Sequence, residues 1–71
     1  MKNKLTEREC CVLFYLAMGL TNEKIADKIH ISVHTVKAHL ESIYYKLKVV
    51  NRVQAAMKAV ALGIIDLKAI A

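Results

Sequence analysis

The stretch TNEKIADKIHISVHTVKAHL, Thr21 to Leu40, predicts two short helices joined by a tight turn. Ser32 is placed to cap the second helix, because its hydroxyl can accept from the backbone N–H of Thr35 three residues later. A two-helix unit of this size, with its second helix displayed to solvent, is the layout of a helix-turn-helix. The stretch therefore indicates DNA binding.

The second of these helices has two unlike faces. Apolar residues recur at spacings of four, three and four, which is typical of a buried stripe: Val36, Leu40, Ile43 and Leu47. The opposite stripe is small or polar and is free to meet a partner: His34, Lys37, Ala38 and Glu41. Lys37 lies in the second turn, where side chains of a recognition helix reach base edges. His39, on the flank of the buried stripe, is interpreted as a packed, hydrogen-bonded histidine in preference to a DNA ligand.

Size and charge restrict the class of protein. The 71 residues are expected to form a single domain over 1–71, with 11 Lys and Arg against 6 Asp and Glu and a net charge of +5. A basic surplus suits a polyanion, nucleic acid before membrane. No apolar run approaches the ~20 residues that a membrane span needs, and the N-terminus MKNKLTERE lacks the apolar core of a signal peptide. The chain is therefore expected in the cytoplasm.

The chemistry-bearing residues predict neither a metal site nor an enzyme. Cys10 and Cys11 are adjacent, so within a helix their side chains point about 100 degrees apart, which is a poor geometry for a disulfide. A metal site would need more ligands at workable spacing. There is no Ser-His-Asp set, no glycine-rich phosphate loop and no pair of carboxylates in a plausible cleft.

Caps and stops predict an all-α fold of four helices. Thr6 and Glu9 form a capping box for the first helix, and Thr21 caps the second. Asn51, with Gln54 in the box position, starts the fourth. The predicted helices cover about residues 7–18, 22–29, 33–48 and 52–62, with the helix-turn-helix unit at about 21–48.

Three residues mark where the predicted helices stop. Gly19 and Gly63 suit the left-handed conformation that commonly follows a helix end. In the turn of the helix-turn-helix unit the backbone is expected to take positive φ, where glycine is frequent. His30 is a defensible substitute, because histidine is enriched in that region, and otherwise it is an ordinary turn residue.

The fourth helix is apolar around most of its circumference. Within it only Arg52, Gln54 and Lys58 are polar, whereas a helix on a three-helix core needs one apolar face. A homodimer contact through residues 51–63 explains the excess. The residues expected in that contact are Val53, Ala56, Met57 and Val60. The alternative is that the tail beyond Gly63, with Ile64, Ile65, Leu67 and Ile70, folds back over the same face.

Short motifs follow one another along most of the chain. LTERE occupies Leu5–Glu9, GLTNEKIA occupies Gly19–Ala26, and an IS-TVK-H pattern runs across Ile31–His39. The series continues with Ile43, KL at Lys46 and Leu47, NR-QA from Asn51 to Ala55, and G-I at Gly63 and Ile64. In this order and spacing the motifs resemble the LuxR-type helix-turn-helix domain, and the resemblance covers nearly the whole chain.

The resemblance implies a four-helix, sequence-specific DNA-binding domain of bacterial transcription regulators. Such domains usually dimerise through the last helix, and their third helix, here 33–48, enters the major groove. The expected partners are double-stranded DNA, a second copy of the chain and RNA polymerase. No cofactor, metal or membrane is expected.

The residues expected at the DNA interface fall into two groups. The resemblance implies that Lys37, Ala38 and Glu41 face the DNA bases. It also implies that Thr35 contacts the DNA backbone. Basic residues around them are expected to bind phosphates and to set the salt dependence of affinity. The full expected set is Lys37, Ala38, Glu41, His34, Thr35, Thr21, Lys24, Lys46, Lys48 and Arg52.

Two departures from the family pattern bear on these expectations. Cys10 and Cys11 stand where Arg and Glu are usual, so a salt bridge of the first helix is expected to be missing. Glu41 stands where a basic or small polar residue is more usual. Its carboxylate is unfavourable beside phosphates unless it accepts from a cytosine amino group or pairs with Lys37.

Two other functions fit part of the pattern. Glu41 and the apolar fourth helix suit a helical protein–protein adaptor that has lost DNA binding. A promoter-binding module that resembles a sigma factor and works as a monomer is the other alternative. DNA affinity that falls steeply with salt distinguishes both DNA binders from the adaptor.

Overall fold

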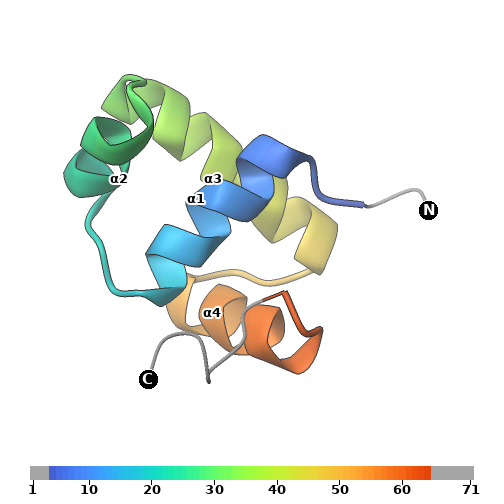
Figure 1. Ribbon diagram of the computed structural model, residues 1–71. Helices are drawn as coiled ribbons and strands as arrows, with labels where there is room; N and C mark the ends of the chain where they lie inside the picture. The colour runs from blue at the N-terminus through green and yellow to red at the C-terminus, as the bar shows by residue number, and fades with distance from the viewer. Residues whose placement is uncertain (1–3, 65–71) are drawn as a thin grey trace.

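Four segments with helical spacing of apolar residues form the four helices of the domain (Figure 1). A computed structural model describes residues 4–64. The helices are α1 (Glu7–Ala17), α2 (Asn22–Ile29), α3 (Val33–Leu47) and α4 (Arg52–Ala61). The all-α fold class and the four-helix order are confirmed, and α1, α3 and α4 end one residue earlier than predicted.

Each helix begins at the polar cap that the sequence predicts. In α1 the Thr6 hydroxyl accepts from the backbone N–H of Glu9 at 3.1 Å, and the Glu9 carboxylate accepts from the N–H of Thr6 at 2.9 Å. Thr21, Ser32 and Asn51 accept from the N–H three residues later at 3.2, 3.0 and 2.8 Å. These bonds satisfy backbone donors that a helix start leaves free, and so fix where each helix begins.

A residue with positive φ ends or follows each helix. Gly19 follows α1 with a φ of 92° and Gly63 follows α4 with a φ of 77°, as expected. His30 ends α2 at a φ of 60°, which confirms the conformation predicted for the turn. Lys48 ends α3 at a φ of 59°. The sequence does not reveal this fourth case, because lysine is not enriched in the left-handed region.

The conformation of Lys48 leads to a stability prediction. Lys48→Gly is expected to raise the free energy of unfolding by about 0.5–1 kcal/mol, because a left-handed residue with a Cβ is strained and glycine is not. Lys58→Gly, in the exposed interior of α4, is the control and is expected to lower it by about 1 kcal/mol. Urea unfolding followed by circular dichroism measures both. A Lys48→Gly variant that unfolds at lower urea than the parent contradicts the strain.

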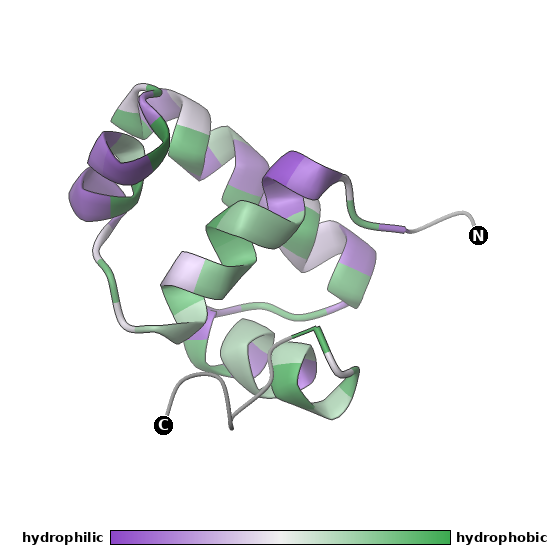
Figure 2. Cartoon of the chain, in the orientation of Figure 1, coloured by the Kyte–Doolittle hydropathy of each residue, from purple (hydrophilic) through white to green (hydrophobic). Residues whose placement is uncertain are grey.

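The core lies between α1 and the other three helices, each of which packs against α1 (Figure 1). The buried apolar residues are Val12, Leu13, Leu16, Ile25, Ala26, Val36, Leu40, Ile43, Leu47, Ala55 and Ala59. The set includes all four residues of the apolar stripe predicted for α3. Figure 2 shows the hydrophobic colour concentrated on α1 and α4, and the hydrophilic colour on the outer side of α2.

The helix α4 covers the core with its smallest side chains. Its buried residues are Ala55 and Ala59, whereas Val53 and Met57 are 68% and 67% exposed. The apolar excess predicted for this helix therefore lies on its outer face. No helix within residues 4–64 is both long and apolar enough to cross a membrane.

Candidate nucleic-acid interface

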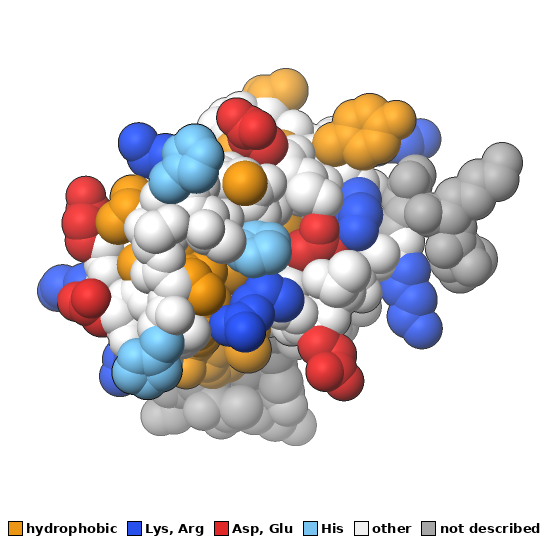
Figure 3. Space-filling model, turned by 90° about the horizontal axis from the view of Figure 1, so that it is seen from above, with side chains coloured by type: hydrophobic (Ala, Val, Ile, Leu, Met, Phe, Trp, Pro, Cys, Tyr) orange, Lys and Arg blue, Asp and Glu red, His pale blue; other side chains and the backbone are white. Residues whose placement is uncertain are grey.

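The outward face of α3 is a continuous stripe of small and polar side chains, which we call the α3 stripe. Its exposed residues are His34, Lys37, Ala38, Glu41, Tyr45 and Lys48. The opposite face of α3 is fixed by buried residues, so the α3 stripe is held outward. Seen from above, Lys, Arg and His side chains are mixed with Asp and Glu (Figure 3). The α3 stripe thus offers hydrogen-bonding groups more than uniform positive charge.

The charged residues of the α3 stripe stand apart from one another. Lys37 and Glu41 are one turn apart, yet no ion pair joins them in the part of the chain that the structure describes. The pairing considered from the sequence is therefore not formed, and both head groups face solvent. His39 is half-buried, as a packed histidine should be, but no described residue hydrogen-bonds its ring. Tyr45, 79% exposed, extends the α3 stripe toward the end of the helix.

The threonines and Lys24 lie beside the helix starts. The Thr35 hydroxyl is 2.9 Å from the Ser32 hydroxyl and is half-buried, so it belongs to the α3 cap as well as to the surface. Thr21 is exposed at the start of α2, where its hydroxyl accepts from the N–H of Lys24. The Lys24 side chain is exposed. Backbone and hydroxyl groups at helix starts are common phosphate contacts.

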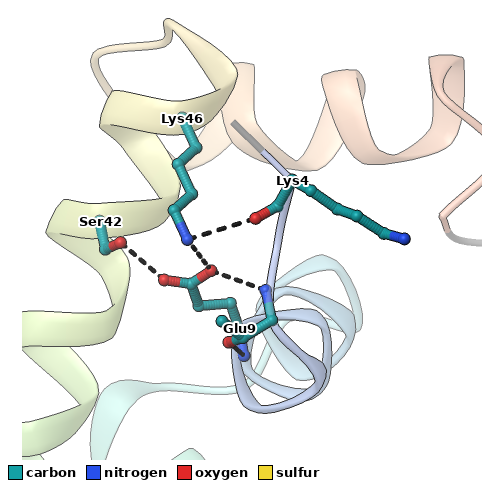
Figure 4. Close-up of polar contacts among 5 residues, drawn as sticks. Lys4, Glu9, Ser42 and Lys46 are labelled. Carbon is teal, nitrogen blue, oxygen red and sulfur yellow. Dashed lines mark hydrogen bonds and ion pairs between the residues drawn. The ribbon is translucent and has the colours of Figure 1, made fainter. Parts of the chain in front are cut away.

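The half-buried Lys46 forms an ion pair with Glu9 (Figure 4). Its Nζ lies 2.8 Å from Glu9 Oε1 and also donates to the carbonyl of Lys4 at 3.3 Å. The Ser42 hydroxyl donates to Glu9 Oε2 at 2.6 Å. An ion pair therefore joins α1 to α3 through Glu9, the residue before Cys10 and Cys11. The Lys46 ammonium predicted to bind phosphate is already bonded to a carboxylate.

The Glu9 carboxylate is stabilised in its charged form. Burial, at 5% exposure, by itself raises the pKa of an acid. The Lys46 ammonium, the Ser42 hydroxyl and the Thr6 N–H outweigh that effect and lower the pKa of Glu9 from 4.5 to about 2. The pair is therefore charged at neutral pH and locks the position of α3 against α1.

Arg52 also uses its head group within the fold. Its Nη1 donates to Asn22 Oδ1 at 2.8 Å, and its Nη2 donates to the Leu20 carbonyl at 2.7 Å. Arg52 and Lys46 were both predicted for the phosphate-binding rim, but the structure places their donors on protein acceptors. Lys48, exposed at the end of α3, has no such partner among the described residues.

The residues predicted for dimerisation lie on the outer face of α4. Val53, Met57 and Val60 are exposed, and Ala56 is half-buried. Ile64, the first residue of the tail that was considered as a cover for this face, is half-buried and packs against the core. Ile65, Leu67 and Ile70, which were considered as a cover for this face, lie outside the described residues.

The described residues offer no metal-binding group. Within 4–64, no three His, Cys, Asp or Glu side chains come together closely enough to hold an ion. Cys10 is half-buried, Cys11 is exposed, and both thiols are free. The candidate nucleic-acid interface is therefore the α3 stripe with the helix starts beside it.

Comparisons with known proteins agree with this geometry. Residues 3–59 match the sequence profile of the family described as bacterial regulatory proteins, luxR family. The chain is 48% identical over 60 residues to transcriptional regulatory protein LnrK of Bacillus subtilis, covering 84% of this chain and 27% of LnrK. It is 46% identical over 55 residues to response regulator protein VraR of Staphylococcus aureus, covering 78% of this chain and 26% of VraR.

A solved structure has the same fold. The crystal structure of response regulator ChrA, from a heme-sensing two-component system, superposes with a TM-score of 0.84 at 44% identity, covering 87% of this chain and 31% of that chain. The chain spans only 26–27% of the length of the curated relatives described above. The family is not one of enzymes, as the sequence predicts. This chain belongs to the LuxR family of bacterial regulatory proteins, as a helix-turn-helix DNA-binding domain.

Proposed function

We propose that this domain reads double-stranded DNA sequence-specifically, with α3 in the major groove, and so regulates bacterial transcription. The observation that carries the proposal is the α3 stripe, exposed along a helix whose other face is anchored in the core. The major groove admits an α-helix and presents a distinct donor and acceptor pattern for each base pair. A rigidly held helix with several different side chains on one face suits that pattern.

The residues divide into base-reading and backbone-binding groups. Lys37, Ala38 and Glu41 lie in the middle of the α3 stripe and are proposed to meet base edges. The backbone contacts are proposed for His34, Thr35, Thr21, Lys24 and Lys48. Lys46 and Arg52 are proposed to support the surface from within, because two donors of each head group already have protein acceptors. Affinity then depends on fewer free cations than the net charge suggests.

The partners beyond DNA are also proposals. The outer face of α4 suits a homodimer, because exposed apolar side chains gather there. Two copies related by two-fold symmetry would bind half-sites about one helical turn apart. RNA polymerase is a further partner, since the relatives LnrK and VraR are named a regulatory protein and a response regulator. A location in the cytoplasm is part of the proposal, because the proposed ligand, bacterial DNA, lies there.

The test separates DNA binding from a protein–protein adaptor. Fluorescence anisotropy with a labelled mixed-sequence duplex is measured between ~50 and 200 mM salt. DNA binding predicts an affinity that falls steeply as salt rises, because bound counterions are released from the phosphates. An adaptor predicts little binding at either end of the range. Sedimentation with and without the duplex distinguishes a dimer from a monomeric promoter module.

Glu41 tests which part of α3 faces DNA. Glu41→Gln is expected to raise affinity for a mixed-sequence duplex about fivefold, because it removes one negative charge beside the phosphates. It is also expected to weaken any preference for cytosine, whose amino group a carboxylate accepts from. Glu7→Gln changes the charge equally on α1, and an equal gain from both variants contradicts the proposed docking of Glu41.

A further inference from the structure

Arg52, the first residue of α4, bridges two residues around the start of α2. The acceptors are the Asn22 side chain at 2.8 Å and the Leu20 carbonyl at 2.7 Å. Both bonds are short and charge-assisted. Asn22 and Leu20 flank Thr21, the cap of α2. The guanidinium therefore hydrogen-bonds to the residues on both sides of the α2 cap.

None of the first three residues of α2 is buried, and the apolar contact nearest to its start is that of the half-buried Leu20, just before the cap. The buried residues of α2 are Ile25 and Ala26, which lie beyond its first turn. α2 and α4 each pack against α1 and α3. Within residues 4–64, the Arg52 bonds are the side-chain hydrogen bonds that tie α4 to the α2 start. The N–H of Leu20 also donates to the Tyr15 carbonyl of α1 at 3.1 Å, so three helices meet at this point.

We propose that Arg52 is a positioning residue, which sets the angle between α2 and α4 and thereby the way the helix-turn-helix unit meets DNA. The inference rests on the proposed function. The first helix of such a unit crosses the DNA backbone while the second enters the groove. Binding geometry has to be held to within about 0.5 Å, so a loose α2 start weakens docking. Arg52 acts through Asn22 and Leu20, and the phosphates are met by free cations such as Lys48.

The decisive variants are Arg52→Lys and Arg52→Met. Lysine keeps the charge but lacks the planar fork that reaches two acceptors, and methionine lacks both. Each is expected to bind a duplex selected from a random pool about tenfold more weakly, the size of a lost charge-assisted hydrogen bond. The salt slope with a mixed-sequence duplex is expected to stay unchanged. Lys48→Met, the matched comparison, is expected to reduce that slope by about 1.

Hydrogen exchange of the free protein tests the Arg52 hydrogen bonds in the absence of DNA. The Ile25 N–H donates to the Thr21 carbonyl at 2.9 Å, and its hydrogen exchange is expected to accelerate in both Arg52 variants. The Val36 N–H, bonded to the Ser32 carbonyl at 3.0 Å, is expected to keep its rate. Asn22→Ala removes one acceptor and is expected to give part of the same effect. It serves as the probe if Arg52→Met does not fold.

Each outcome decides the role of Arg52. Full affinity and full exchange protection in Arg52→Lys overturn the proposal. A salt slope that falls by about 1 in Arg52→Met also overturns it, because Arg52 is then a phosphate ligand. If the parent chain binds no duplex, the proposed function fails and the docking role of Arg52 fails with it. Accelerated exchange at Ile25 then still supports the bridge itself.

Discussion

Glu9→Ala is expected to lower the free energy of unfolding by about 2–4 kcal/mol, because it breaks a partly buried ion pair and the cap of α1 together. The change leaves the Lys46 ammonium and the Ser42 hydroxyl without their acceptor and removes half of the α1 capping box. A domain of 71 residues has a total stability of only about 4–10 kcal/mol. Urea unfolding followed by circular dichroism measures the loss.

The control for Glu9 is another acid in the first turn of the same helix. Glu7 is exposed, so Glu7→Ala is expected to change stability by less than about 1 kcal/mol. Glu9→Gln keeps an acceptor but loses the charge, and its effect should lie between the two. Equal losses from Glu7→Ala and Glu9→Ala contradict the role given to the buried pair.

The same carboxylate makes stability fall in acid. The pKa of Glu9 is about 2 in the folded domain against 4.5 ordinarily, so the unfolded chain takes up the proton first. The stabilisation is complete above pH 4.5 and is lost as the pH falls from 4.5 toward 2. The loss amounts to about 3 kcal/mol at about 1.4 kcal/mol per pKa unit. Glu9→Gln is expected to remove this part of the pH dependence, which stability curves at several pH values measure.

Met57→Glu is expected to abolish dimer formation and to weaken binding to a duplex with two half-sites by about 100-fold, because an unpaired carboxylate is placed in an apolar contact. Met57 is 67% exposed in the middle of the outer α4 face, between Val53 and Val60. The substitution should leave the fold intact, since the side chain makes no part of the core. Sedimentation at micromolar concentration and anisotropy with the duplex measure the two effects.

Gln54→Glu is the matched control for Met57→Glu. It adds the same charge to the same helix, and its carboxylate keeps an oxygen to accept from the Val50 N–H, as the Gln54 amide does at 3.0 Å. Dimer formation should survive this change. A parent chain that sediments as a monomer with and without DNA contradicts the dimer, as does a Met57→Glu variant that dimerises normally.

Most of the fold follows from local features of the sequence. Thr6, Thr21, Ser32 and Asn51 each stand three residues before an N–H that they accept from, and this spacing marks a helix start without knowledge of the tertiary structure. The four-three-four spacing in α3 likewise identifies its buried face. His30 was also predictable, because few residue types tolerate its backbone conformation.

The candidate site was less predictable, because charge in a sequence does not say where a head group goes. In the sequence, nothing distinguishes Lys46 and Arg52 from basic residues without a protein partner. In the structure, their hydrogen-bond acceptors come from α1 and from the start of α2. Glu9 lies 37 residues from Lys46, and Asn22 lies 30 residues from Arg52, so no local sequence pattern reveals either pair. The one local hint is Ser42, four residues before Lys46, which places both on the Glu9 side of α3.

The most direct test of DNA reading by α3 is selection from a random duplex pool by the parent chain and by Lys37→Ala. The parent is expected to enrich a two-fold motif with half-sites about ten base pairs apart. Lys37→Ala is expected to select the same motif with the preference relaxed at one base pair per half-site, at a loss of about 1–3 kcal/mol. No enrichment by the parent, or an identical motif from both proteins, contradicts the account.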